Sequence, residues 1–338
     1  MPRSIDEFVA SWEALSGGRG EEGGWRGIAV APVGDCELLA ARHFPGNEEA
    51  LLARFPTVRL GSSERLPEGR GFEVVRADPF SDGKTWIALS RKESGSPELF
   101  AEMVGDVAGA MDACAAEGEV AVLRTMLRRV RMWQQFMSRG AGLLSPEAEL
   151  GLAGELYFMR VFLDEGVSSE TTLKGWVGPD DAPQDFRIGD GANEVKATMS
   201  SSGFPVKIGS LEQLDDAVAS PLFLAAVRFA KGDGGLTLPE IVGEIERRLG
   251  DELGAIDFLR EKLMLAGYSD SHAGQYSRRF EPKEKRILSV SEGFPRLTVG
   301  VVPVGVTRAI YEINLDHAGD FLTDLDVALR LLGVMDDA

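Results

Sequence analysis

The chain has 338 residues, of which 44 % are hydrophobic, so it can bury one large core or two smaller ones and is not a disordered protein. No apolar run approaches the roughly 18 residues that a membrane span needs, and the first residues lack the hydrophobic region of a signal peptide. The formal net charge of −18 opposes binding to the phosphates of a nucleic acid.

The cysteines point to a reducing compartment. Cys36 and Cys114 are the only two, and neither belongs to a CxxC pair, which argues against a disulfide framework and against a cysteine-based zinc site. We therefore expect a cytoplasmic protein that does not bind a membrane and that keeps two reduced, mostly buried thiols.

The first 140 residues are expected to form an α+β domain. Short runs of β-branched and apolar residues, separated by proline and glycine, predict strands at 27–33, 71–77 and 86–90. Helices are predicted from about 97 to 115 and from about 120 to 138. No pattern in this domain indicates a particular chemistry.

The second of these helices carries basic residues within an acidic chain. No acidic residue occurs from Val120 to Pro146, and Arg124, Arg128 and Arg131 follow the i, i+4, i+7 spacing of one helix face. Two interpretations stay open at this point. The stripe is either a solvated face that pairs with carboxylates elsewhere, or a surface that binds the phosphates of a nucleic acid.

The next predicted helix carries an acid in an unusual position. Serine followed by proline at 145–146 predicts its start, since serine is a preferred N-cap and proline suits the first helical position, and the helix should run to about 164. Glu155 lies three residues from both Leu152 and Phe158, and therefore inside the apolar stripe. A carboxylate there must be buried, paired or bound to a metal.

Several short elements complete a second predicted domain over residues 141–338, with a core at about 145–230 and a C-terminal elaboration at 231–338. Gly189-Asp190-Gly191 is a strong hairpin signal between the first two strands. The other elements are predicted from apolar runs and helical periodicity. The strands are expected at 185–188, 193–199, 206–209, 222–229, 286–290, 298–304 and 309–315, and the helices from Ser210, at 237–267 with a break near Gly250, and at 321–332.

The triplet Glu194-Val195-Lys196 is the strongest chemical pattern. Because side chains alternate along a strand, Glu194 and Lys196 point to one face. Asp185 joins that face only if the residue numbers of hairpin partners sum to an odd value, and the turn leaves this open. Carboxylates placed so closely repel unless a cation lies between them, and magnesium prefers such oxygen ligands. A nearby lysine can orient an attacking water or help to neutralise the transition state.

A second acid-x-lysine triplet tests how specific this pattern is. Glu281-Pro282-Lys283 has a central proline, which cannot donate to a sheet ladder, and it has polar flanks. We therefore expect it outside the interior of a sheet, and we place the candidate site at the first triplet.

An ordered set of five segments resembles the PD-(D/E)XK nuclease superfamily and, more narrowly, the bacterial "PD-(D/E)XK motif protein" family that occurs among antiphage defence genes. The resemblance covers about residues 145–225. It implies an α/β (α+β) fold with a restriction-endonuclease-like core, in which helices flank a mixed β-sheet. The segments are Gly151–Leu156, Trp176–Pro179, Asp185-Phe186, Glu194–Lys196 and Ser210–Leu214.

The resemblance also implies residue roles. Asp185 and Glu194 would be ligands of Mg²⁺ or Mn²⁺, Lys196 the catalytic lysine, and Glu155 an accessory acid. Asp180 follows a proline, as the superfamily name suggests, and is a rival of Asp185. Asp185 is preferred because apolar residues after it begin a strand.

Gln213 has two interpretations. It matches a glutamine that many relatives carry after the core strands, which would make it part of the catalytic site. It also stands three residues after Ser210, the spacing of a capping box at a helix start.

The sequence thus leads to two functional hypotheses. The first is a divalent-metal-dependent endonuclease that cuts DNA, with RNA not excluded, in a bacterial defence system alongside proteins of the same operon. The second is a catalytically silent subunit of nuclease fold that scaffolds a partner ATPase or helicase, which the acidic charge favours. A homo-oligomer is compatible with both.

Overall fold

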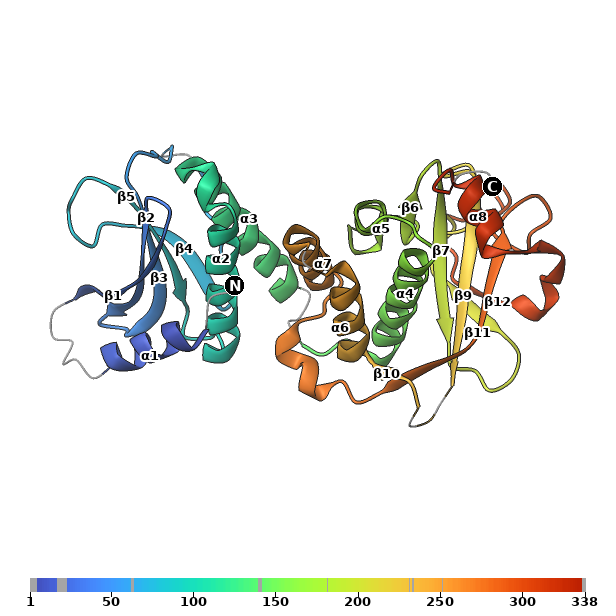
Figure 1. Cartoon of the computed structure of the whole chain (residues 1–338), viewed down its shortest axis with the longest axis horizontal. Coiled ribbons are helices and arrows are strands. Elements are labelled where there is room, and N and C mark those ends of the chain that lie inside the picture. Colours follow the sequence, from blue (N-terminus) through green and yellow to red (C-terminus); the bar gives the residue numbers. More distant parts are fainter. Residues whose placement is uncertain are drawn as a thin grey trace. The chain divides into compact units, whose positions relative to one another are not determined.

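The computed structural model describes residues 5–16, 23–61, 64–138, 142–180, 182–230, 232, 234–250 and 252–335. The chain divides into two compact units, residues 1–141 and 142–338 (Figure 1). Helices and sheets occur in both, so the predicted mixed α/β class is confirmed. None of the helices in the described part of the chain has the length and apolar character that crossing a membrane requires.

The first unit contains one antiparallel sheet with the strand order β1-β2-β3-β5-β4, together with three α-helices and a short 3-10 helix in the described residues. The two thiols are free and buried, as expected. The elements are α1 (Ile5–Ser16), β1 (Gly24–Val33), β2 (Cys36–Phe44), β3 (Glu48–Phe55), β4 (Phe72–Ala77), β5 (Thr85–Arg91), α2 (Pro97–Ala113), η1 (Ala115–Glu117) and α3 (Glu119–Ser138).

The second unit is built on a mixed sheet with the order β10-β11-β9-β7-β6, in which β13 also pairs with β11. Strands β7 and β9 are parallel, and the other pairs are antiparallel. Its strands are β6 (Phe186–Ile188), β7 (Gly191–Thr198), β8 (Pro205–Ile208), β9 (Leu222–Ala230), β10 (Leu236–Thr237), β11 (Arg279–Ser289), β12 (Tyr311–Asn314) and β13 (Leu322–Thr323).

The first helix of this unit is the one predicted to begin after Ser145. Ser145 caps its N-terminus, because its side chain accepts a hydrogen bond from the Ala148 N–H at 3.2 Å. The α-helices are α4 (Pro146–Asp164), α5 (Ser169–Gly175), α6 (Leu238–Leu249), α7 (Leu253–Leu265) and α8 (Leu325–Leu331), and the 3-10 helices are η2 (Gly178–Asp180), η3 (Asp270–Gln275), η4 (Leu315–His317) and η5 (Gly319–Phe321).

The two faces of this sheet are covered differently. Helices α4 and α6 cover one face, where Val195 of β7 joins the larger apolar core (Figure 1). The opposite face carries a smaller core, to which the two-stranded sheet of β8 and β12 contributes. Ala192, Leu224 and Ala226 face this second core. Glu194 and Lys196 lie two and four residues after Ala192 on β7, so their side chains point to the same face of the sheet as Ala192.

Three sequence predictions differ from the structure. The first is the helix from Ser210, which is a series of turns instead. Asp215 explains it, because its side chain accepts a hydrogen bond from the Ala217 N–H at 3.0 Å and so competes with helical bonding. The capping-box interpretation of Gln213 is therefore wrong.

The second difference is the strand expected at 298–304, which is a loop with turns. Thr298 accepts hydrogen bonds from the Val301 and Val302 N–H groups at 3.0 and 3.1 Å, so the chain reverses locally. Gly300 and Pro303 interrupt the β-branched run, and proline cannot donate to a ladder.

The third difference is the triplet Glu281–Lys283, which does lie in a sheet strand, β11. Its partners in the ladder come from β9 alone, and a bulge follows Pro282. The proline therefore sits where its missing N–H is not needed, which is the position that a strand tolerates.

Candidate active site

The site begins where α4 touches β7. A Cβ atom on Gly154 would lie 2.7 Å from the Cβ atom of Ala197, so only glycine lets the helix approach the strand this closely. The next residue on the helix is Glu155. The close packing at Gly154 thus holds Glu155 beside the strand that carries the acid-Val-Lys triplet.

Trp176 holds Glu155 in place. Its indole N–H donates to Glu155 Oε2 at 2.7 Å, and the tryptophan side chain is 0 % exposed. Trp176 also bridges to Phe186, at the start of β6. The expected need of Glu155 for a partner is therefore met by an indole. Trp176 lies in one of the segments that resemble the family, but the sequence indicates no role for it, because only the fold brings it to the helix.

The hairpin has the register that brings Asp185 to the triplet. Phe186 pairs with Asn193, and the same odd sum would place the preceding residue, Asp185, opposite Glu194. Along β7, strand β6 reaches only residues 191–193, so in the described part of the chain no strand pairs with β7 on this side from residue 194 onward. The side chain of Asp185 takes the place of a strand partner there, because its Oδ2 accepts a hydrogen bond from the Val195 N–H at 2.7 Å.

Gly178 lies against two of the acids at once. A Cβ atom there would lie 3.0 Å from Asp185 Oδ1 and 3.3 Å from Glu155 Oε2. The Gly178 N–H also donates to the Asp185 carbonyl oxygen at 2.9 Å, as does the Val177 N–H. Both carboxylate oxygens therefore lie within 3.3 Å of the same point, which places Glu155 and Asp185 side by side.

Glu194 and Lys196 form an ion pair on the same face of β7. Lys196 Nζ donates to Glu194 Oε1 at 2.5 Å. The side chain of Glu194 is 0 % exposed, while that of Lys196 is 16 % exposed. The lysine is thus the member of the pair that solvent, or a substrate, reaches.

The four groups act on each other electrostatically. Burial, and then Asp185, raise the pKa of Glu155 to about 8, and the same two causes hold the pKa of Glu194 well above its ordinary value. Burial raises the pKa of Asp185 against the opposing effects of Lys196 and the Val195 N–H. Burial by itself would lower the pKa of Lys196, but Glu194 and Asp185 outweigh it and raise the pKa. Burial therefore opposes the ionised forms of all three acids, and Lys196 offsets this effect only in part.

One carboxylate oxygen of Glu194 bears on whether the site suits a cation. Glu194 Oε2 is buried and has no hydrogen-bond partner among the described residues, an arrangement that is costly without a cation. Among the residues that the structure describes, no three acidic, histidine or cysteine side chains lie close enough to hold one ion together. Asp185 and Glu194 fit an ion such as Mg²⁺, which accepts one or two carboxylates and keeps several waters.

The rival aspartate lies elsewhere. Asp180 in η2 pairs with Lys262 of α7, and its side chain is 44 % exposed. The structure groups Asp185, and not Asp180, with the other acids. This geometry favours the preferred sequence interpretation of the metal ligand.

Gln213 belongs to a segment beside the site. Its Oε1 accepts a hydrogen bond from the Gly209 N–H at 2.7 Å. The buried Gln184, directly before Asp185, donates to the Glu212 carbonyl oxygen at 2.9 Å. No sequence signal marked Gln184, yet this residue ties the Gln213 segment to the candidate metal ligand that follows it, Asp185.

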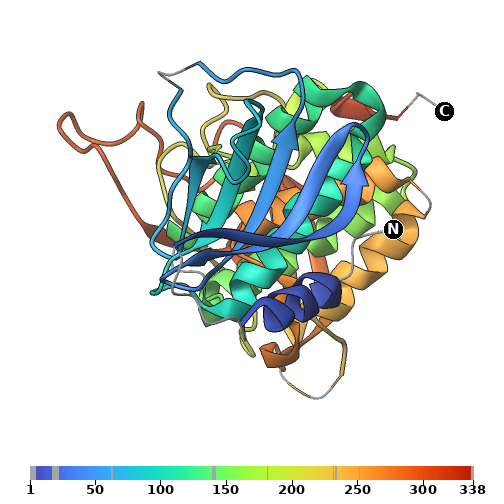
Figure 2. The ribbon, with the colours of Figure 1, turned by 90° about the vertical axis from the view of Figure 1, so that its left-hand side faces the viewer.

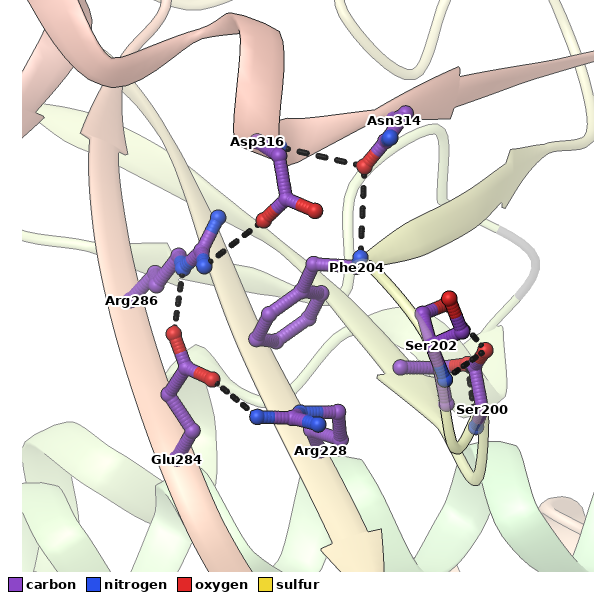
Figure 3. Close-up of polar contacts among 9 residues, drawn as sticks. Ser200, Ser202, Phe204, Arg228, Glu284, Arg286, Asn314 and Asp316 are labelled. Atoms are coloured by element: carbon purple, nitrogen blue, oxygen red, sulfur yellow. Dashed lines mark hydrogen bonds and ion pairs between the residues drawn. The ribbon is translucent and has the colours of Figure 1, made fainter.

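A row of ion pairs continues across the same sheet face (Figure 3). Glu284 of β11 accepts from Arg228 at 2.5 Å and from Arg286 at 2.7 Å, and Arg286 also donates to Asp316 at 2.9 Å. Arg286 is paired with Ala226, which is itself the partner of Lys196. Each arginine is balanced by a carboxylate, so this row stiffens the sheet beside the site and adds no net charge.

The basic residues of α3 share one face, as expected. Arg124, Arg128 and Arg131 are all exposed on that helix. Arg129 points inward instead and forms an ion pair with Asp106 at 2.6 Å. The stripe belongs to the first unit, whereas the acids and Lys196 belong to the second.

Acidic residues and a lysine that converge where β7 extends beyond its neighbour β6 in a mixed sheet define a chain of PD-(D/E)XK type. A family model described as "Putative PD-(D/E)XK family member, (DUF4420)" matches residues 8–316. The chain belongs to this family, as its resemblance predicted. No curated protein and no solved structure gave a match.

Proposed function

We propose that this protein is a divalent-metal-dependent nuclease that hydrolyses phosphodiester bonds in DNA. The observation that carries the proposal is the convergence of Asp185, Glu194 and Lys196, with one buried oxygen of Glu194 left without a partner. Membership of a PD-(D/E)XK family supports the same reaction class.

Asp185 and Glu194 would hold Mg²⁺ or Mn²⁺. When bound, such an ion offsets charge on the phosphoryl oxygens and makes a water more acidic. The raised pKa values of both carboxylates fit this role, because a bound cation would favour the ionised forms that burial disfavours. The Val195 N–H keeps the Asp185 carboxylate oriented.

Lys196 and Glu155 supply the remaining chemistry. The ammonium group of Lys196 reaches solvent from a fixed ion pair, so it can orient a water and balance charge on the phosphate. Glu155 is partly buried beside Asp185, with a pKa of about 8. It can therefore hold or release a proton near neutral pH.

We further propose that the substrate is DNA of an invading phage, since the family resemblance lies with antiphage defence genes. The free, buried cysteines suit the cytoplasm, where such DNA is met. Because the chain carries a net charge of −18, we propose that proteins of the same operon help to bring DNA to the site.

The test is cleavage of plasmid and linear DNA with Mg²⁺ or Mn²⁺. Lys196→Ala should lower the rate by about 10²-fold or more, the usual effect of removing a group that stabilises the transition state. Lys283→Ala is the matched control, because Lys283 also pairs with the acid two residues before it at 2.5 Å but lies 52 % exposed in β11. Metal-dependent cutting that survives Lys196→Ala and Glu194→Ala would refute the assignment.

A second candidate is the catalytically silent subunit that scaffolds an ATPase or helicase. Two observations favour it: the net charge of −18, and the direct pairing of Lys196 with Glu194, which already neutralises one ligand. Metal uptake separates the candidates. A silent subunit takes up no Mn²⁺, either by itself or with a DNA oligonucleotide.

A further inference from the structure

An exposed apolar loop connects β11 to β12. Isolated exposed apolar residues are ordinary, but several in one short segment are typical of a binding surface. Figure 2 shows this loop, in orange-red, projecting from its unit. Its exposed aliphatic side chains are Leu297, Val299, Val301, Val304, Val306 and Ile310.

The charge of the loop differs from that of the whole chain. No acidic residue occurs from Gly293 to Tyr311, whereas Arg296 and Arg308 both fall there. Arg308 is exposed. In a chain with a net charge of −18, such a segment is one of the few that a polyanion can approach without repulsion.

The base of the loop is fixed on both sides. Arg296 donates to the Leu214 carbonyl oxygen at 2.8 Å and forms an ion pair with Asp216 at 2.9 Å. The Leu297 N–H donates to the hydroxyl of Tyr311 at 3.0 Å, which closes the loop at its other end. The loop is therefore a projection with an anchored base.

This base adjoins the candidate active site by two routes. The first route is the segment that contains Glu212 and Leu214. Arg296 donates to the Leu214 carbonyl oxygen, and Gln184, which precedes Asp185, donates to the Glu212 carbonyl oxygen. Tyr311 packs on the sheet face that Glu194 and Lys196 share. Burial raises the pKa of Tyr311, and both Lys196 and Glu194 also act on it electrostatically.

We propose that residues 297–310 bind duplex DNA, with the valines entering the minor groove and Arg308 contacting a phosphate. The inference deepens the proposed nuclease function and rests on it. Aliphatic wedges suit the minor groove of duplex DNA. The loop has no aromatic residue, which argues against a platform for stacking single-stranded bases. Its base at the site lets the loop place the scissile phosphate.

The first experiment measures binding of a short fluorescein-labelled DNA duplex to the full chain by anisotropy, in Ca²⁺, with the duplex checked for integrity. The variant Val299→Ser/Val301→Ser/Val304→Ser should bind at least about tenfold more weakly, because three apolar side chains lose their contact. Leu331→Ser is the control, since Leu331 in α8 is 58 % exposed and Val299 is 59 % exposed. It should bind as the wild type does.

Two further measurements separate the loop from the chemistry. Arg308→Ala should reduce by about one the slope of log affinity against log salt concentration, because one phosphate contact is lost. Hydrolysis of bis(p-nitrophenyl) phosphate in Mn²⁺ needs no groove contact, so the triple valine variant should retain it while cutting duplex DNA more slowly.

Unchanged duplex affinity in the triple variant, or no duplex binding by the wild type, overturns the inference. A change in the association state of the protein with unchanged DNA affinity also overturns it, and makes the loop a contact between copies. A wild type that binds duplex through the loop but hydrolyses neither substrate refutes the proposed nuclease function and leaves the loop inference standing.

Discussion

At the scale of single residues, the site depends on how each acid is held. Glu155 has an indole partner and Asp185 has a backbone N–H. Glu194 has Lys196 at one oxygen and, among the described residues, no partner at the other. The sequence predicted that Glu155 needs a partner but could not identify Trp176, because the two residues are 21 positions apart and only the tertiary fold brings them together. Side-chain parity, in contrast, was readable from the triplet alone.

Trp176→Phe tests whether the indole hydrogen bond positions Glu155. The change removes one buried hydrogen bond and part of a packed ring, so we predict a loss of about 2–4 kcal/mol of stability. Nuclease activity should fall about tenfold or more, because a small misplacement of a catalytic group is costly. Urea unfolding and the cleavage rate check both effects. Trp133→Phe is the control, since Trp133 donates to Asp106 in the same way at 2.8 Å in the first unit.

The pH dependence of stability follows from the raised pKa values. Glu155 titrates near pH 8 in the folded chain but near its ordinary value of 4.5 when unfolded, so the folded state binds more protons between these values. Stability without metal should therefore fall as pH rises from about 4.5 to 8. Thermal unfolding in EDTA measures this, and Glu155→Gln should flatten the slope. A metal-free stability that rises with pH over this window contradicts the assignment.

At the scale of elements, contact between α4 and β7 positions the whole site. The helix could be predicted from its serine-proline start and apolar stripe. The odd register of the hairpin could not, because it depends on a two-residue turn that pairs Ile188 with Gly191. Strands β2 and β3 were missed because their leucines, alanines and glutamates favour a helix, and pairing on both sides overrides that preference.

Gly154→Ala tests this contact. The added methyl group meets Ala197 at 2.7 Å, so the helix must move away from β7, and we predict a loss of about 1–3 kcal/mol together with lower activity. Gly243→Ala in α6 is the control. Nothing lies within 4 Å of a Cβ atom there, so alanine should stabilise that helix by up to about 1 kcal/mol. Equal behaviour of the two variants would show that close packing at Gly154 is unimportant.

At the scale of the whole molecule, charge is distributed unevenly. Acid-free segments at 120–146 and 293–311 interrupt a chain whose net charge is −18, one beginning in each unit. The first was evident in the sequence as a helical stripe. The second was hidden by its β-branched residues, which predicted a strand, and only its exposure shows that it is available for binding. The family model spans residues 8–316, so the likeness extends over both units.

Calorimetric titration of the full chain with Mn²⁺ is the most direct test of the central claim, that Asp185 and Glu194 hold a divalent ion. We predict that the wild type and Asp180→Asn take up the ion and that Asp185→Asn loses most of this uptake, because Asp180 pairs with Lys262 while Asp185 faces the other acids. Uptake that is absent from the wild type, or equal in Asp185→Asn, would contradict the claim.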